Sequence, residues 1–187
     1  MAIKTFTDAV ALPASDINTY LANSGWVYVN SGTFATSGFV QVNNVFTSTY
    51  TNYKIVFHNL LLTAGTNSAI LQLSASGTPA GTNGYYSGSQ FWTFAVTPAT
   101  APFGDSNSGS WGGLYLDSTV RSSAEWTFYN PAVAVPTQQT YNTIAWTNSV
   151  RVGGGVHNVA TAYDGFRLTP TTSTISGTWS VYGQRNA

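Results

Sequence analysis

Short runs of alternating apolar and polar residues follow one another along most of the chain. In the clearest run, residues 53–58, Tyr53, Ile55 and Phe57 share one face. Because successive side chains of a strand point to opposite faces, this period of two predicts a half-buried β-strand. Similar runs rich in β-branched and aromatic residues lie at 26–29, 39–42, 70–73, 91–96, 126–129, 141–146, 165–168 and 178–182. Short strands at this spacing predict an all-β fold, an antiparallel β-sandwich that is jelly-roll-like.

One segment near the N-terminus has helical rather than strand character. In residues 12–21 (LPASDINTYL), Ser15 can cap a helix, and Asp16 then complements the helix dipole. The apolar stripe of this short helix consists of Ile17, Tyr20 and Leu21. A helix of one or two turns is not stable alone, so we expect it to dock on another surface.

The change of pattern near residue 26 divides the chain into two predicted regions. Residues 1–25 are expected to be an attachment segment with the short helix, and residues 26–187 the β-sandwich domain. The residues expected to make the attachment are Leu12, Ile17, Tyr20 and Leu21. Three stretches, 77–88, 97–113 and 153–155, are predicted to be loops because they are rich in Gly, Ser, Pro and Asn.

Charge is scarce in this sequence. Charged residues make up 6% of the 187 residues, and six Lys and Arg balance six Asp and Glu, so the formal net charge at pH 7 is zero. Since nucleic-acid binding requires clustered cations, we expect no nucleic-acid partner. Aromatic residues make up 14%, which is typical of half-buried pleated surfaces.

Cysteine is absent, which excludes disulfides, thiolate metal sites and cysteine nucleophiles. The first residues, MAIKTFTD, contain no apolar stretch of the signal-peptide type. The longest apolar runs, such as residues 60–62, are far shorter than the ~20 residues of a membrane-spanning helix. We therefore expect synthesis in the cytoplasm and no membrane insertion.

No motif in the sequence combines residues into a catalytic site. The six acidic residues are well separated, and only the fold could bring a pair such as Glu125 and Asp164 together for glycosidase chemistry. His58 and His157 are the two imidazoles, and no motif places either beside a nucleophile. We interpret both as structural histidines and expect no enzymatic activity.

Two short motifs resemble ligand-binding loops only in part. Residues 105–109 (DSNSG) begin like a calcium loop, but the twelfth position is Leu116 instead of Glu. The three glycines at 153–155 lack the Lys-Ser/Thr pair and the strand–helix context of a phosphate loop. We interpret the first motif as a polar turn and the second as a loop, and we expect no metal and no cofactor.

Three aromatic residues, Tyr85, Tyr86 and Trp111, lie within the predicted loops. An aromatic ring held by a loop can stack on the face of a sugar while nearby amides and hydroxyls bind the sugar's hydroxyl groups. Such rings can equally pack against a neighbouring subunit or anchor their own loop. If they bind a glycan, Trp111→Ala is expected to weaken binding without lowering the melting temperature.

Several blocks of the sequence resemble a family of bacteriophage proteins. Phe6 and residues 12–21 resemble the opening segment of phage tail and virion-surface proteins. Residues 45–56 (VFTSTYTNYKIV) are similar to a strand pair of phage fibre-type domains, many of them from marine and cyanobacterial viruses. Residues 162–168 (AYDGFRL) and 174–186 (TISGTWSVYGQRN) are similar to that family's closing motifs. The resemblance implies a homo-oligomeric, non-enzymatic β-sandwich of the tail-fibre or head-decoration type.

These observations lead to a functional hypothesis. We expect a structural protein of a phage virion, made in the host cytoplasm and associated with other virion proteins. A chain with so little charge would expose apolar patches as a monomer, and the family implies three-fold assembly, so we expect a homotrimer. We favour a tail-fibre or adhesin module that contacts host surface glycans. The alternatives are a capsid decoration protein that stabilises the phage head and, from another class, a polysaccharide-degrading enzyme.

Overall fold

The computed structural model describes residues 25–93, 100–145 and 149–184, and within these ranges every regular element is a β-strand. The strands are β1 (Trp26–Ser37), β2 (Val40–Val42), β3 (Asn52–Leu62), β4 (Thr66–Ala75), β5 (Thr78–Pro79), β6 (Tyr85–Thr93), β7 (Thr100–Ser108), β8 (Trp111–Asp117), β9 (Ser122–Tyr129), β10 (Thr137–Ala145), β11 (Ser149–His157), β12 (Gly165–Pro170) and β13 (Ile175–Gln184). A search of the described residues finds no helix with the length and apolarity needed to cross a membrane. The predicted helix, with Leu12, Ile17, Tyr20 and Leu21, lies outside the described residues.

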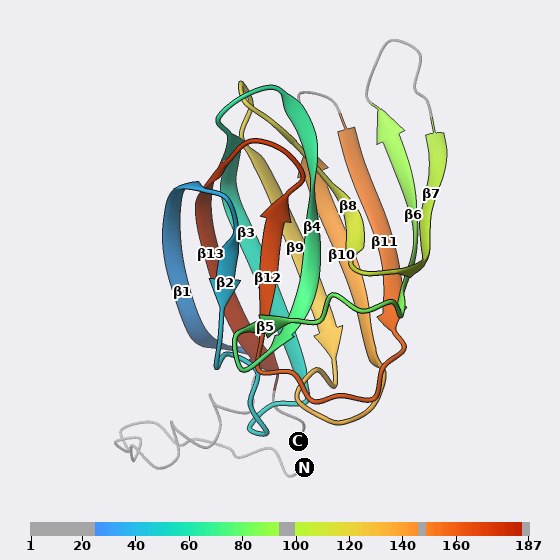
Figure 1. The fold of residues 1–187 in the computed structure, drawn as a ribbon. Helices are drawn as coiled ribbons and strands as arrows, with labels where there is room; N and C mark the ends of the chain where they lie inside the picture. Colours follow the sequence, from blue (N-terminus) through green and yellow to red (C-terminus); the bar gives the residue numbers. More distant parts are fainter. Residues whose placement is uncertain (1–24, 94–99, 146–148, 185–187) are drawn as a thin grey trace, which may run out of the picture.

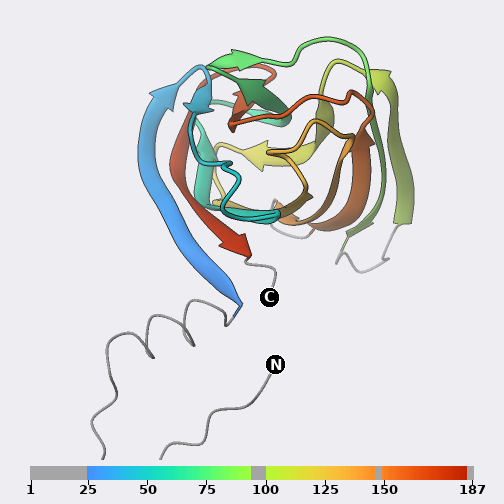
Figure 2. The ribbon, with the colours of Figure 1, turned by 90° about the horizontal axis from the view of Figure 1, so that it is seen from below.

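The strands form two antiparallel sheets that pack face to face (Figure 1). The larger sheet has eight strands in the order β1-β13-β3-β9-β10-β11-β6-β7. The smaller sheet has the order β2-β12-β4-β5, and β8 pairs with the first part of β4. The larger sheet curves around the smaller one (Figure 2). The predicted all-β, antiparallel sandwich is therefore confirmed.

The chain passes repeatedly from one sheet to the other. The connections from β1 to β2, β3 to β4, β8 to β9 and β12 to β13 each join the two sheets. As a result, β1-β13-β3-β9 in the larger sheet face β2-β12-β4-β8 in the smaller one. The remaining strands β10, β11, β6 and β7 widen the larger sheet on one side, and this extension carries the surface described below.

Alternate residues of the two sheets meet in an aromatic core. Ile55 and Phe57 of β3 and Trp126 of β9 are buried on the inner face of the larger sheet. Phe57 packs edge-on against Trp126 and against Phe166 of β12, with ring centroids 5.8 Å apart in both pairs. Since Phe166 belongs to the smaller sheet, these contacts join the two layers. They also fix the strand register, because a slip of one residue would turn every core side chain toward solvent.

The three predicted loops are wrong in whole or in part. Residues 97–113 include all of β7 and the start of β8, and residues 153–155 lie inside β11. Strand β6 begins at Tyr85, within the predicted loop 77–88. The physical reason is pairing: β6 and β11 are hydrogen-bonded on both sides, and these ladders hold Gly- and Ser-rich segments that have little strand preference of their own.

Candidate functional site

Tyr85 and Trp111, two of the three predicted glycan-binding residues, are buried in the core. Their exposed fractions are 0% and 1%, and their rings meet edge-on with centroids 4.8 Å apart. The prediction that these two residues lie in loops is wrong, because they begin strands β6 and β8 and pairing turns both side chains inward. In this structure a sugar can reach neither ring.

His157 completes this buried cluster. Its imidazole stacks on the Tyr85 ring with centroids 3.9 Å apart, and it lies edge-on to Trp111. Burial in this apolar environment lowers the pKa of His157 and raises the pKa of Tyr85, so both are neutral at pH 7. His58, by contrast, is exposed on β3. The buried position of His157 agrees with its interpretation as a structural histidine.

Tyr86, the third predicted residue, points the other way. It is 37% exposed on the outer face of the larger sheet. Its backbone carbonyl accepts a hydrogen bond from the Trp111 indole Nε1, at 3.3 Å. Trp111 therefore fixes the strand that carries Tyr86 from behind, without facing the surface itself.

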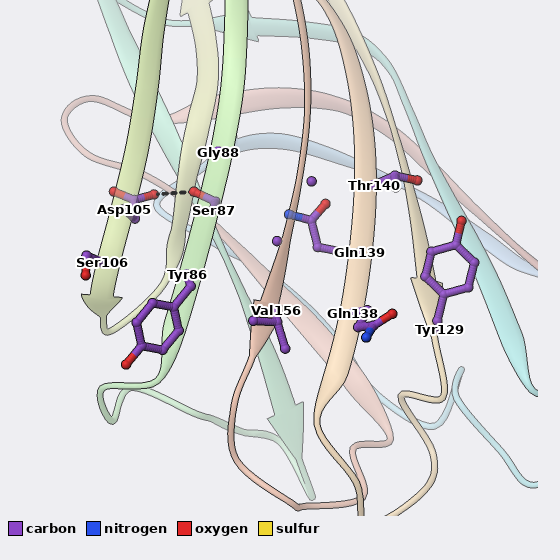
Figure 3. Close-up of a pocket in the computed structure, with 12 residues that line it drawn as sticks. Tyr86, Ser87, Gly88, Asp105, Ser106, Tyr129, Gln138, Gln139, Thr140 and Val156 are labelled. Atoms are coloured by element: carbon purple, nitrogen blue, oxygen red, sulfur yellow. Dashed lines mark hydrogen bonds between the residues drawn. The ribbon is translucent and has the colours of Figure 1, made fainter.

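Tyr86 borders a groove of about 560 Å³ on the outer face of the larger sheet (Figure 3). The groove crosses β9, β10, β11, β6 and β7. Outward-facing side chains that line it include Tyr86, Val156, Gln138, Tyr129 and Thr140. These residues are far apart in the sequence and come together because their strands are neighbours in the sheet.

One wall of the groove is a row of directly opposed residues. Tyr86 pairs with Val156, and Val156 pairs with Gln138. Gln138 in turn pairs with Tyr129. Directly opposed residues of neighbouring strands point to the same face, so an aromatic ring stands at each end of this row with an amide between them. Figure 3 shows the four side chains side by side near the ends of their strands.

The floor of the groove is formed by the next row, Gly88, Gly154 and Thr140. Gly88 pairs with Gly154, and Gly154 pairs with Thr140. A Cβ atom at Gly88 would have no atom within 4 Å, so this position opens directly into the groove. A Cβ atom at Gly154 would lie 3.0 Å from the carbonyl oxygen of Gln139. The groove exists because two neighbouring strands carry no side chain at this level.

Asp105 of β7 lies beside the groove, but its side chain turns to the inner face of the larger sheet, because it pairs with Ser87, the neighbour of the outward-facing Tyr86. Its Oδ2 accepts hydrogen bonds from the Ser87 hydroxyl at 3.0 Å and from the Gly112 backbone N–H at 2.9 Å. The motif 105–109 is predicted to be a polar turn, but residues 105–108 lie in β7, so that prediction is wrong. In the part of the chain that the structure describes, no three His, Cys, Asp or Glu residues are grouped closely enough to hold a metal ion.

Glu125 and Asp164, the pair considered for glycosidase chemistry, each interact with another part of the protein. Glu125 lies on β9 and forms an ion pair with Lys54, with 3.0 Å between Nζ and Oε1. The Asp164 carboxylate accepts the backbone N–H of Ser76 at 3.1 Å. The groove itself offers aromatic rings, an amide and a hydroxyl, which are groups suited to binding a polyhydroxylated ligand.

Sequence reasoning missed Tyr129, Gln138 and the glycine floor. The signal for the floor is present in residues 149–157 (SVRVGGGVH), where Val150, Val152 and Val156 keep a period of two across the glycines. This alternation predicts a strand that continues through the glycines. Composition alone favoured a loop.

Comparisons with known proteins leave the family of this chain open. No family model matches the sequence, and no curated protein matches it. Among solved structures, the fold is weakly similar to the CBM2 module of the evolved Dit of Lactobacillus casei BL23 phage J-1. That likeness has a TM-score of 0.20 and 9% sequence identity, and it covers 81% of this chain and 68% of the other. A similarity of this size supports no conclusion about fold or function.

Replacing Trp111 tests its assignment to the core. Trp111→Ala is expected to lower the free energy of unfolding by about 3–5 kcal/mol, because a large buried ring is removed and a cavity is left. Urea denaturation followed by fluorescence measures this change. Tyr86→Ala is the matched control and should shift the unfolding midpoint little. An unchanged midpoint for Trp111→Ala would show that the ring does not contribute to the core.

The buried imidazole predicts a pH-dependent stability. Since the pKa of His157 in the folded protein lies below its ordinary value of 6.5, the unfolded chain binds a proton more readily. Stability should be complete above pH 6.5 and fall as the pH drops below it. Urea midpoints measured from pH 7.5 to 5.5 check this, and His157→Phe should flatten the dependence while His58→Gln keeps it. Equal slopes in the wild type and His157→Phe would contradict the prediction.

Proposed function

We propose that this domain binds a glycan in the groove across β9, β10, β11, β6 and β7, and that it serves as an adhesin module of a bacteriophage virion. The observation that carries the glycan-binding proposal is the glycine floor beside an exposed tyrosine. A sugar ring can lie over Gly88 and Gly154 with one face against Tyr86. The groove's size also lies within the range of ligand sites in proteins.

The polar groups of the groove support the same ligand class. Gln138 offers both a donor and an acceptor, and the Thr140 hydroxyl also offers both. Sugars present hydroxyl groups of both kinds around an apolar ring face. The mixture of ring and hydrogen-bonding groups matches that chemistry better than it matches an apolar or a strongly charged ligand.

The assignment to a virion is supported by the resemblance of residues 12–21, 45–56, 162–168 and 174–186 to phage tail-fibre and virion-surface proteins. We also infer a jelly roll from the strand order, because β1-β13-β3-β9 and β2-β12-β4-β8 are wound as two interleaved four-stranded sheets. We propose no catalytic role for this groove.

We further propose that the protein acts as a homotrimer. An apolar hollow of about 290 Å³ lies on the outer face of the larger sheet, over β9, β10 and β11. Its exposed large hydrophobic side chains are Ile144 and Val152, at 63% and 43%. Such a patch is typical of a protein–protein contact. It lies at the opposite end of the strands from Tyr86 and Gln138, so contact between subunits there leaves the groove open.

Filling the groove tests the proposed function. Gly88→Leu is expected to weaken glycan binding at least tenfold, because the new side chain fills the floor, where an added Cβ atom meets no other atom within 4 Å. Tyr86→Ala should weaken binding about fivefold, the equivalent of one aromatic contact of about 1 kcal/mol. An array of bacterial surface polysaccharides identifies a ligand, and calorimetry then gives the affinities.

Gly38→Leu is the matched control, since Gly38 also has open space around it but lies between β1 and β2. It should bind like the wild type. Added salt should change the affinity little, since binding depends on few charges. Wild-type affinity in Gly88→Leu, or a steep salt dependence, would refute binding of a glycan in this groove.

Light scattering tests the trimer. The wild type is expected to have three times the single-chain mass of 19.9 kDa. Ile144→Lys should release single chains, because a charge would be buried in an apolar contact. A wild-type mass of one chain, or an unaltered trimer in Ile144→Lys, would exclude this contact.

A further inference from the structure

The row of residues that forms one wall of the groove continues beyond it. Tyr129 pairs with Asn52 of β3, and Asn52 pairs with Gln184 of β13. Gln184 then pairs with Trp26 of β1, the edge strand of the larger sheet. The Asn52 amide donates a hydrogen bond to the Gln184 Oε1 at 3.1 Å. A single transverse row, from Trp26 to Tyr86, therefore crosses the outer face of the larger sheet from β1 to β6.

Aromatic rings recur at regular intervals along this transverse row. Tyr86 on β6 and Tyr129 on β9 are three strand spacings apart, with β11 and β10 between them. Tyr129 and Trp26 on β1 are also three spacings apart, with β3 and β13 between them. With neighbouring strands about 4.8 Å apart, each interval is about 14 Å and the whole row about 29 Å. The positions between the rings include three side-chain amides, those of Gln138, Asn52 and Gln184. Aromatic side chains that can stack on sugar rings thus alternate along the row with amides that can bind sugar hydroxyls.

The surroundings of the transverse row carry little net charge. The Lys54 ammonium lies 4.9 Å from the centroid of the Trp26 ring, but it also forms the ion pair with Glu125. The carboxylate of Asp105, near the other end, turns to the inner face of the sheet and accepts two hydrogen bonds there. A polyanion would need clustered cations, which the described residues of this row do not supply. A neutral ligand is favoured.

We infer that the ligand is a neutral, linear glycan that crosses the strands along the transverse row and rests on Tyr86, Tyr129 and Trp26. This inference rests on the proposed function and extends it. The ligand is then a glycan chain bound along the transverse row, and not only a single sugar in the groove. A sugar unit in an extended glycan is about as long as the spacing between strands, so the three rings meet every third unit. Because the larger sheet curves around the smaller one, the glycan chain must be flexible enough to follow a convex face (Figure 2).

The test is the dependence of affinity on ligand length. The probe is a size ladder, made by partial hydrolysis of the polysaccharide that the wild type binds on the glycan array. Affinity should rise with length and level off only when a fragment covers all three rings. Trp26→Ala should weaken binding of the long fragments about fivefold and leave the short fragments, which reach only Tyr86 and Tyr129, unchanged.

Two further variants keep the result interpretable. Trp26→Tyr retains a ring and should restore most of the length dependence, which a merely structural role of Trp26 in β1 would not predict. Phe39→Ala removes an exposed aromatic residue outside the row and should have no effect.

The outcomes separate the two proposals. Two results would place the glycan in the groove and not along the transverse row. One is that Gly88→Leu abolishes binding while affinity does not depend on ligand length. The other is that Trp26→Ala binds long fragments like the wild type. Binding only to charged or short branched glycans also overturns the inference. If no glycan binds, or Gly88→Leu has no effect, the proposed function itself fails.

Discussion

The register of the aromatic core is the constraint on which the rest of the structure depends. Tyr53, Phe128 and Gln139 face each other across β3, β9 and β10 and are all buried. Since side chains alternate between the two faces, the residues one position away, Tyr129 and Gln138 among them, must align on the outside. The outer rows are therefore set by packing on the inner face. A binding surface built in this way needs no loop to position it.

The three glycines of β11 have different roles on the two faces of the sheet. A Cβ atom at Gly155 would lie 2.2 Å from the Tyr86 carbonyl oxygen, and one at Gly153 would lie 2.6 Å from that of Gly88. These two positions tolerate no side chain, because β6 approaches too closely. Gly154, between them, faces outward and forms part of the floor of the groove. Glycine in a strand costs about 0.5–1 kcal/mol relative to alanine, and pairing of β11 with both β10 and β6 offsets that cost.

The sequence predicts the parts of the fold whose side chains alternate strongly, and it fails where they do not. The pattern of residues 53–58 identifies β3, and similar patterns identify most of the other strands. Strand β7 and the glycines of β11 depend on pairing with distant segments, which local composition does not report. The adjacent Tyr85 and Tyr86 illustrate the limit for the site. In a strand, neighbouring side chains must face opposite ways, so one of the two rings had to be buried, but only the register decides which.

The scarcity of charge shapes how such a surface can bind. Without electrostatic steering, association relies on rings and neutral hydrogen bonds, and one aromatic contact is weak. Affinity must therefore come from repetition of weak contacts. Within a chain, the transverse row from Trp26 to Tyr86 would supply several contacts to the proposed linear ligand. Between chains, a contact through Ile144 and Val152 would leave each groove accessible, and simultaneous binding raises the effective concentration of every further site. Both forms of repetition would follow from one wide sheet, whose outer face carries the groove at one end of its strands and an apolar patch at the other.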